Sequence, residues 1–388
     1  MKNLPIGFQD FADLINFKCV YVDKTKLIYQ LATTGKNYFL SRPRRFGKSL
    51  LCSTISALFS GKKELFDGLW VASSECNYDW PVHPVLHLSM SKVFHPTVDG
   101  FVARLSIEMD SIAKGFGLNT AHLEFPTTKL IFIIESLAQR GSQVVLLIDE
   151  YDYPIVSSIP DEAKANQMVE ILKNFYTPLK DLNAHIRMLF VTGISKFAHT
   201  SLFSGLNQLE DLTIDREMAT ILGYTENEII SSFPTHLAAA SSVLKIPVDK
   251  VMERMRGWYN GYRFHQDSLP VYNPFSVLNF LKQKDFKEFW FATGTPTFLI
   301  KLVREKEYPP EMMGEIRATA KELGAHEVGR MPFKTLLFQT GYLTIGSAQT
   351  VMYDPFGQES TTEYLLTFPN FEVRSSYFES LLTVIKHL

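Results

Sequence analysis

The sequence predicts an α/β fold in which a parallel sheet is flanked by helices, and three observations support it. Amphipathic helical patterns alternate with apolar runs through about residue 195. Polar motifs begin where several of the runs end, as expected at the carboxyl edge of a parallel sheet. The apolar runs have the length of buried strands and lie at residues 38–40, 85–88, 144–148 and 186–191.

The first polar motif is Arg42-Pro-Arg-Arg-Phe-Gly-Lys-Ser49, called here the phosphate loop. It connects a strand to a helical pattern, and this arrangement holds nucleotide phosphates because backbone N–H groups face the anion. We expect Lys48 to reach the β- and γ-phosphates and the Ser49 hydroxyl to bind Mg²⁺. The predicted nucleotide-binding residues are Arg44, Arg45, Phe46, Gly47, Lys48, Ser49 and Leu50.

The loop departs from the generic pattern at one position. Arg42 stands where the first glycine is expected, and Pro43 favours extended backbone angles at Arg42. Taken alone, a Gly-Lys-Ser sequence has a simpler alternative, a helix start with a solvent-facing lysine. A second motif therefore matters for the interpretation.

That second motif is Asp149-Glu150, which follows the run at 144–148. An acid at the end of a central strand lies beside the phosphate loop, so Asp149 is expected to bind Mg²⁺. Glu150 is expected to orient and polarise an attacking water. The alternative is a core strand followed by an acidic turn, but two motifs in this order favour a P-loop nucleotide site that uses ATP and Mg²⁺.

A third motif, Thr192-Gly-Ile-Ser195, follows the run at 186–191. In ATPases with an extra strand between the loop and the acid, a polar residue here contacts the γ-phosphate or the water. Thr192 is the first candidate and Ser195 the second. An ordinary strand-ending turn is the alternative.

Composition narrows the class of protein. A hydrophobic content of 46%, a charged content of 21% and a net charge of −2 are typical of a soluble globular protein with no global attraction to nucleic acid. The basic cluster of Arg42, Arg44, Arg45 and Lys48 is best explained by phosphate binding. Three scattered cysteines offer neither a disulfide framework nor zinc-ligand spacing, so a reducing cytoplasm is expected. No signal peptide or membrane-spanning run is evident.

The chain changes character near Gly223. Thr225-Glu-Asn-Glu228 reads as a capping box and Asn273-Pro274 as another helix start. We expect three domains: an ATPase domain at 1–222, a helical lid at 223–330, and a small winged-helix-like segment at 331–388. The last segment mixes a short helix, strands near 342–345 and 364–368, and a helix from Tyr377 to His387.

With these motifs in place, the chain resembles a bacterial AAA-ATPase-like family whose members typically carry a C-terminal PD-(D/E)XK nuclease-like domain. The loop is also similar to the Gly-Pro-Arg-Arg loop of archaeal-type ATPases related to STAND proteins. The matching stretches include Tyr21-Val-Asp-Lys-Thr25, the phosphate loop, Leu147-Ile-Asp-Glu-Tyr-Asp152, Trp258-Tyr-Asn-Gly-Tyr262 and Phe368-Pro-Asn-Phe-Glu-Val373.

The resemblance implies a P-loop ATPase core, a helical lid and a winged-helix-like segment. Family members usually continue well beyond the Pro-Asn-Phe-Glu-Val stretch, and no nuclease core is evident in this sequence. Nuclease activity is therefore not assigned, and a nuclease-like effector is expected only as a C-terminal or separate partner.

The leading function is an ATP-binding and Mg²⁺-dependent ATP-hydrolysing motor or switch. The alternative is a non-hydrolysing module that binds ATP or ADP and signals through lid movement. A DNA-binding module is a third interpretation, for which no basic recognition stripe is evident, and an oligomer is compatible with the sequence. Candidates for an arginine at the γ-phosphate are Arg44, Arg45, Arg216 and Arg263.

Overall fold

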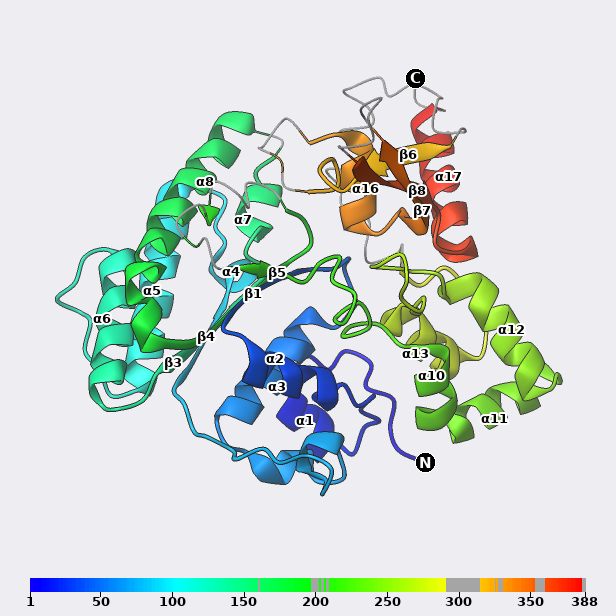
Figure 1. The fold of residues 1–388 in the computed structure, drawn as a ribbon, viewed down its shortest axis with the longest axis horizontal. Coiled ribbons are helices and arrows are strands. Elements are labelled where there is room, and N and C mark those ends of the chain that lie inside the picture. Colours follow the sequence, from blue (N-terminus) through cyan, green and yellow to red (C-terminus); the bar gives the residue numbers. More distant parts are fainter. Residues whose placement is uncertain are drawn as a thin grey trace.

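The computed structural model describes residues 1–159, 161–196, 202–203, 206, 209–290, 315–324, 326, 331–352 and 360–385. A five-stranded sheet of order β2-β3-β4-β1-β5 forms the centre of the N-terminal half (Figure 1). Every neighbouring pair in it is parallel, which confirms the α/β fold class expected from the apolar runs. The strands are β1 (Asn37–Ser41), β2 (Val85–Ser89), β3 (Val144–Asp149), β4 (Ile186–Gly193) and β5 (Glu210–Asp211).

Helices lie on both faces of this sheet. On one face are α1 to α3, and on the other are α5, α6 and α8 (Figure 1). Because β1 and β3 are buried along their whole length, they have the continuous apolar character of strands covered on both sides. The helices of this half are α1 (Phe11–Asn16), α2 (Thr25–Thr34), α3 (Lys48–Phe59), α4 (Met90–Val93), α5 (Val98–Gly115), α6 (Pro126–Gln139), α7 (Tyr153–Val156) and α8 (Glu162–Tyr176).

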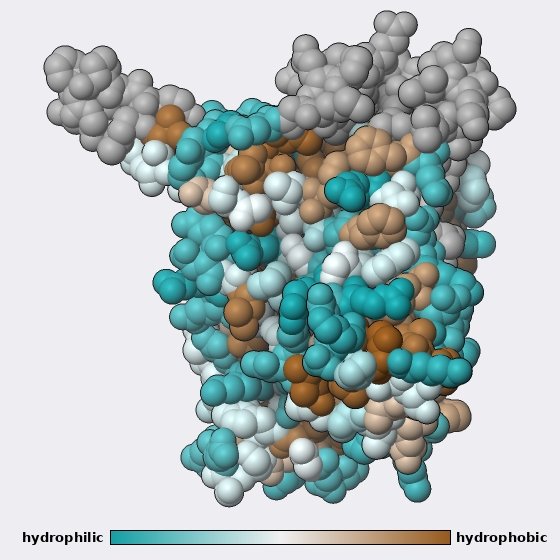
Figure 2. Space-filling view, turned by 90° about the vertical axis from the view of Figure 1, so that its right-hand side faces the viewer, coloured by the Kyte–Doolittle hydropathy of each residue, from teal (hydrophilic) through white to brown (hydrophobic). Residues whose placement is uncertain are grey.

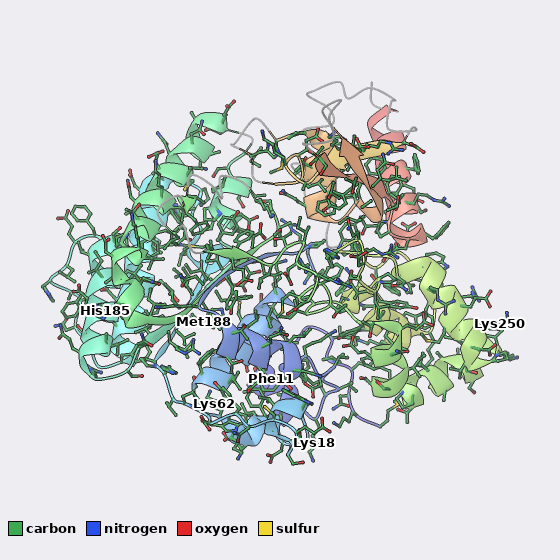
Figure 3. The ribbon with its side chains drawn as sticks, in the orientation of Figure 1. Phe11, Lys18, Lys62, His185, Met188 and Lys250 are labelled. Atoms are coloured by element: carbon green, nitrogen blue, oxygen red, sulfur yellow. The ribbon has the colours of Figure 1, made fainter. Side chains whose placement is uncertain are left out.

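Helix α1 is bonded to α3 and packs its aromatic residue on the segment that follows α3. The backbone N–H of Phe11 donates to Ser53 Oγ at 2.9 Å, and the Phe11 ring is fully buried against Phe66. Figure 3 shows Phe11 inside the fold and Lys250 at its periphery. The N-terminal segment is thereby held against the helix that begins at the phosphate loop.

A set of four helices, called here the lid helices, follows the sheet. They are α10 (Glu226–Ser232), α11 (Pro234–Leu244), α12 (Val248–Tyr259) and α13 (Pro274–Gln283). Both predicted helix starts are confirmed. Thr225 and Glu228 form a reciprocal capping box, and Asn273 Oδ1 accepts from the N–H groups of Phe275 and Ser276.

The lid helices bury an apolar cluster of their own, to which Val20 and Val22 from the N-terminal segment contribute.

Figure 2 shows the face on the right-hand side of Figure 1, where hydrophilic residues separate several hydrophobic groups. Among the described residues, no helix is long and apolar enough to cross a bilayer.

The C-terminal segment contains α16 (Phe333–Thr340), α17 (Phe371–Ile385) and an antiparallel sheet of order β6-β8-β7. The strands are β6 (Ile316–Thr319), β7 (Thr344–Met352) and β8 (Ser360–Thr367). Strand β6 falls in the range expected to be helical, so this part of the prediction needs correction. A four-residue strand carries little periodic signal, and β6 is defined by its pairing with β8, including an Arg317–Glu363 ion pair.

The last helix also starts earlier than expected. Asn370 Oδ1 accepts from the N–H of Val373 at 3.1 Å, so α17 begins at Phe371 and not at Tyr377. Residues 386–388 and most of 291–330 lie outside the described residues, so the expected lid and helix are tested only in part.

Candidate nucleotide site

The phosphate loop connects β1 to α3 and ends in a left-handed turn. Gly47 is the N-cap of α3 with φ +95°, and Arg45 has φ +67°. A Cβ at Gly47 would meet only Leu222, at 3.9 Å, so the glycine is required by its backbone angle and not by crowding. The turn lets α3 begin directly after the loop, with its unpaired N–H groups at the loop end.

Lys48 is buried and folds back over the loop. Its Nζ donates to the carbonyl oxygens of Arg42 and Pro43, both at 3.0 Å. Burial lowers the pKa of Lys48, while the nearby carboxylates of Asp149 and Glu150 act in the opposite direction. The ammonium is therefore held inside the loop, where a phosphate group would compete with two neutral carbonyls for it.

Arg42 is buried and bonded to backbone carbonyls, so the sequence interpretation of the basic cluster as phosphate-binding is corrected for this residue. It is 1% exposed, and its guanidinium donates to the carbonyl oxygens of Ser41, Thr213 and Met218 at 2.9, 2.7 and 3.3 Å. The guanidinium also lies 3.9 Å from the ring centre of Phe264. Burial lowers the pKa of Arg42 to about 9, and Arg42 acts as an internal strut between β1 and residues 213–218.

A cavity of about 430 Å³ lies beside the phosphate loop. Its volume is in the range of small-molecule sites. Polar lining comes from the loop, including Ser49, and from Glu150, and apolar lining comes from Ile6, Val22 and Phe275. The cavity is lined by residues 5–9, 20–22, 44–51 and 221–224, by α13, and by single residues including Leu14, Lys24, Thr54 and Tyr153.

The two acids occupy different environments at the end of β3. Glu150 lines the cavity with φ +54°, and burial raises its pKa. Asp149 is 3% exposed and does not line the cavity, but it acts electrostatically on Lys48. Asp149 Oδ1 has no hydrogen-bond partner among the described residues, and a buried carboxylate oxygen without a donor fits a cation ligand.

Strand β4 lies between β1 and β3, so Thr192 is placed between the loop strand and the acid strand. Its hydroxyl donates to the carbonyl oxygen of Leu40 at 2.8 Å. Ser195 Oγ donates to Asp152 Oδ2 at 2.6 Å, and Asp152 also accepts from the N–H groups of Ile194 and Ser195. Neither hydroxyl lines the cavity, and both brace the strand ends.

The phosphate loop is also held from outside by segments distant in the sequence, and this was not expected from the sequence. Trp290 Nε1 donates to the carbonyl oxygen of Arg44 at 3.2 Å. The Phe46 ring packs edge-on to Tyr262, with centroids 4.8 Å apart. A Cβ at Gly341 would lie 2.6 Å from Pro43 Cβ, so the turn after α16 touches the loop directly.

Glu372 links α17 to the same region. It is fully buried, and its carboxylate accepts from Ser276 Oγ at 2.7 Å and from the N–H groups of Phe289 and Trp290 at 2.5 and 2.7 Å. Burial raises the pKa of Glu372 to about 7. The carboxylate thus fixes the backbone that carries the Trp290 indole onto Arg44.

Lys24 makes a further connection that the sequence did not reveal. Its Nζ donates to Glu228 at 2.7 Å and to the carbonyl oxygen of Thr220 at 2.8 Å. Glu228 is the capping-box residue of α10, so one ion pair joins the N-terminal segment to the lid helices.

Of the arginines considered for the γ-phosphate, Arg44 and Arg45 line the cavity. Arg45 lies 5.2 Å from the ring centre of Phe275 on α13. Arg263 is directed elsewhere, because its Nη1 donates to the carbonyl oxygen of Gly346 in β7 at 3.2 Å. Neither Arg263 nor Arg216 lines the cavity.

The sequence matches known proteins along most of its length. A family model described as a predicted AAA-ATPase matches residues 5–203. The chain belongs to this family. An uncharacterized protein in the vnfD 5′ region of Azotobacter chroococcum mcd 1 is 37% identical over 383 residues, covering 98% of this AAA-ATPase-like chain and 70% of that protein.

A similarity to a solved structure is weaker. The Aeropyrum pernix ORC1 protein in complex with DNA aligns at a TM-score of 0.31 and 11% identity, covering 92% of this chain and 91% of that one. A structural similarity at that level is too low to assign a fold. The α/β fold is assigned from the five-stranded parallel sheet.

Proposed function

We propose that the chain binds ATP in the cavity beside the phosphate loop, hydrolyses it with Mg²⁺, and acts as a motor or switch for an attached or partner effector. The observation that carries the proposal is the position of Lys48, Ser49 and Glu150 around one cavity at the carboxyl edge of a parallel sheet.

Each residue has a role that its placement supports. Lys48 is poised to exchange two loop carbonyls for phosphate oxygens, and residues 44–50 present the backbone of the loop. Ser49 and Asp149 would hold Mg²⁺, which neutralises phosphate charge when bound. We propose that Glu150 accepts the proton of an attacking water, which its position in the cavity lining supports, and that Thr192 holds the end of β4 beside it.

The apolar lining supports an adenine base at the other part of the cavity. Ile6, Val22 and Phe275 come from the N-terminal segment and from a lid helix, so a bound base would contact both. This arrangement supports a switch in which nucleotide occupancy changes the hold of the lid helices on the N-terminal half.

The first test is Lys48→Ala. Loss of the ammonium should weaken ATP binding at least about tenfold, roughly 1.4 kcal/mol, as measured by calorimetry. Lys62→Ala removes an exposed lysine and is the matched control. Equal ATP affinities in wild type, Lys48→Ala and Lys62→Ala would contradict the phosphate-loop assignment.

The second test separates hydrolysis from a binding-only module. Glu150→Gln should retain ATP binding and lose most phosphate release, because the amide cannot accept the proton. Glu135→Gln alters an exposed glutamate on α6 and serves as the control. Absence of Mg²⁺-dependent turnover in the wild type would favour the alternative, a non-hydrolysing module that binds ATP or ADP.

The location and the divisions of the chain are also part of the proposal. The three cysteines are free, which supports a cytoplasmic protein. The ATPase domain at 1–222, the lid at 223–330 and a winged-helix-like segment at 331–388 remain working divisions, although β6 pairs with the last of these.

A further inference from the structure

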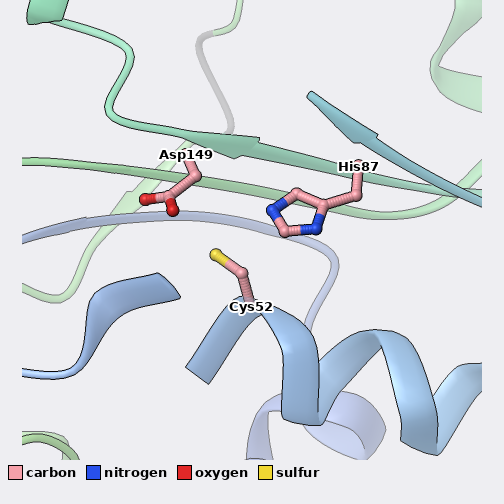
Figure 4. Close-up of side chains that lie close together, drawn as sticks. All are labelled: Cys52, His87 and Asp149. Atoms are coloured by element: carbon pink, nitrogen blue, oxygen red, sulfur yellow. The ribbon is translucent and has the colours of Figure 1, made fainter. Parts of the chain in front are cut away.

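Three metal-binding types of side chain meet beneath the phosphate loop. Cys52 lies on α3, His87 on β2 and Asp149 at the end of β3. Their ligand atoms all lie within 4.8 Å of one another. Figure 4 shows the three side chains close together, with Cys52 on the helix facing His87 and Asp149 on the two strands.

The fold explains why they converge. Strands β2 and β3 pair in parallel with His87 opposite Leu147 and Ser89 opposite Asp149. Side chains two positions apart on a strand share a face, so His87 and Asp149 lie on the same side of the sheet. Cys52 is one helical turn after Ser49, and both therefore lie on one side of α3.

The donor set selects the kind of ion. A thiolate, an imidazole and a carboxylate are ligands of zinc, whereas Mg²⁺ takes oxygen ligands. Bond lengths of about 2.0–2.3 Å place zinc ligands within roughly 4 Å of one another. The present spacing needs only a small closing movement, and His87 is exposed, so an ion has a path from solvent.

We propose that Cys52, His87 and Asp149 form a zinc site that competes with Mg²⁺-nucleotide for Asp149. Binding replaces the proton of the Cys52 thiol by zinc and releases that proton to solvent. The fourth coordination position is left for water. The Asp149 oxygen without a partner is the shared ligand, and the competition rests on the proposed function, which assigns Asp149 to Mg²⁺.

Zinc binding is measured first, without nucleotide. Wild-type protein should compete with a chromophoric chelator for one equivalent of Zn²⁺, and its Co²⁺ complex should show a thiolate-to-metal absorption band. His87→Gln and Cys52→Ala should each weaken zinc binding at least about tenfold. Cys76→Ser, which changes a cysteine outside the cluster, should behave as wild type.

His87→Gln keeps the test decisive if the buried Cys52 variant fails to fold, because His87 is exposed. Equal zinc affinity in wild type and His87→Gln, or a Co²⁺ complex without the thiolate band, would overturn the site.

Competition is measured next, as ATP affinity in excess Mg²⁺ with and without one equivalent of Zn²⁺. Zinc should weaken ATP binding in the wild type at least severalfold and leave His87→Gln unchanged. An unchanged wild-type affinity would overturn the shared role of Asp149. Failure of zinc-free wild type to bind ATP would instead refute the proposed function, since the chelator measurement does not depend on nucleotide.

Discussion

The substitution Gly341→Ala tests how firmly the C-terminal segment holds the phosphate loop. Gly341 has φ +92°, a left-handed angle that costs an alanine about 1–2 kcal/mol. The new Cβ would also lie 2.6 Å from Pro43 Cβ and 2.7 Å from Pro43 Cγ. A proline ring cannot rotate away, so the loop backbone must move, and such overpacking costs about 1–3 kcal/mol. Together the two terms predict a loss of about 2–5 kcal/mol.

Gly141→Ala is the matched control. Gly141 also has φ +92°, but a Cβ there meets no atom within 4 Å, so only the backbone term of about 1–2 kcal/mol applies. Urea unfolding gives the free energy of unfolding of both variants, and calorimetry gives their ATP affinities. Gly341→Ala should lose more stability and bind ATP more weakly than Gly141→Ala. Equal losses of stability and unchanged ATP affinity would refute the contact.

Two further predictions concern buried or misassigned charges. Since burial raises the pKa of Glu372 to about 7 from 4.5, the folded state retains a proton that the unfolded state has lost between these values. Stability should therefore fall as pH rises through this window, by up to about 1.4 kcal/mol per pH unit, and level off above it. The neighbouring Glu288 also raises the pKa of Glu372. Urea unfolding at several pH values should show that the free energy of unfolding depends less on pH in Glu372→Gln than in the wild type. An identical pH dependence in both proteins would contradict the burial argument. Arg263→Ala should cost about 1 kcal/mol of stability through the lost bond to Gly346, while ATP affinity and turnover stay at wild-type values. A loss of turnover without loss of binding in that variant would restore Arg263 as a phosphate ligand.

The features that the sequence could predict are those encoded locally. The apolar run before Asp149 and the Gly-Lys-Ser after β1 each specify a strand end within a few residues. Thr225 and Asn273 are similar cases, because a cap depends only on the residues that immediately follow it. The parallel sheet and the position of the polar motifs at its strand ends could therefore be predicted from the sequence pattern alone.

The features that escaped prediction depend on contacts across the chain. Arg42 was grouped with the phosphate-binding residues because it belongs to the basic cluster of the loop, yet it is buried among three backbone carbonyls and an aromatic ring. Glu372 has no sequence signal for its role, since its donors come from α13 and from residues 289–290. The cluster of Cys52, His87 and Asp149 likewise has no signal in the cysteine spacing, because its three side chains come together only in the folded sheet.

The contacts that later parts of the chain make with the phosphate loop have a consequence for the order of folding during synthesis. Translation delivers β1, β3 and Lys48 early, but the groups that press on the loop arrive with Tyr262, Trp290 and Gly341. Nascent domains begin to fold from the N-terminus while the rest is still being made. The sheet can therefore form on the ribosome before its loop is braced. If the proposed nucleotide site needs these contacts, a growing chain should bind ATP only after Tyr262, Trp290 and Gly341 have packed on the loop, and not as soon as the sheet has formed.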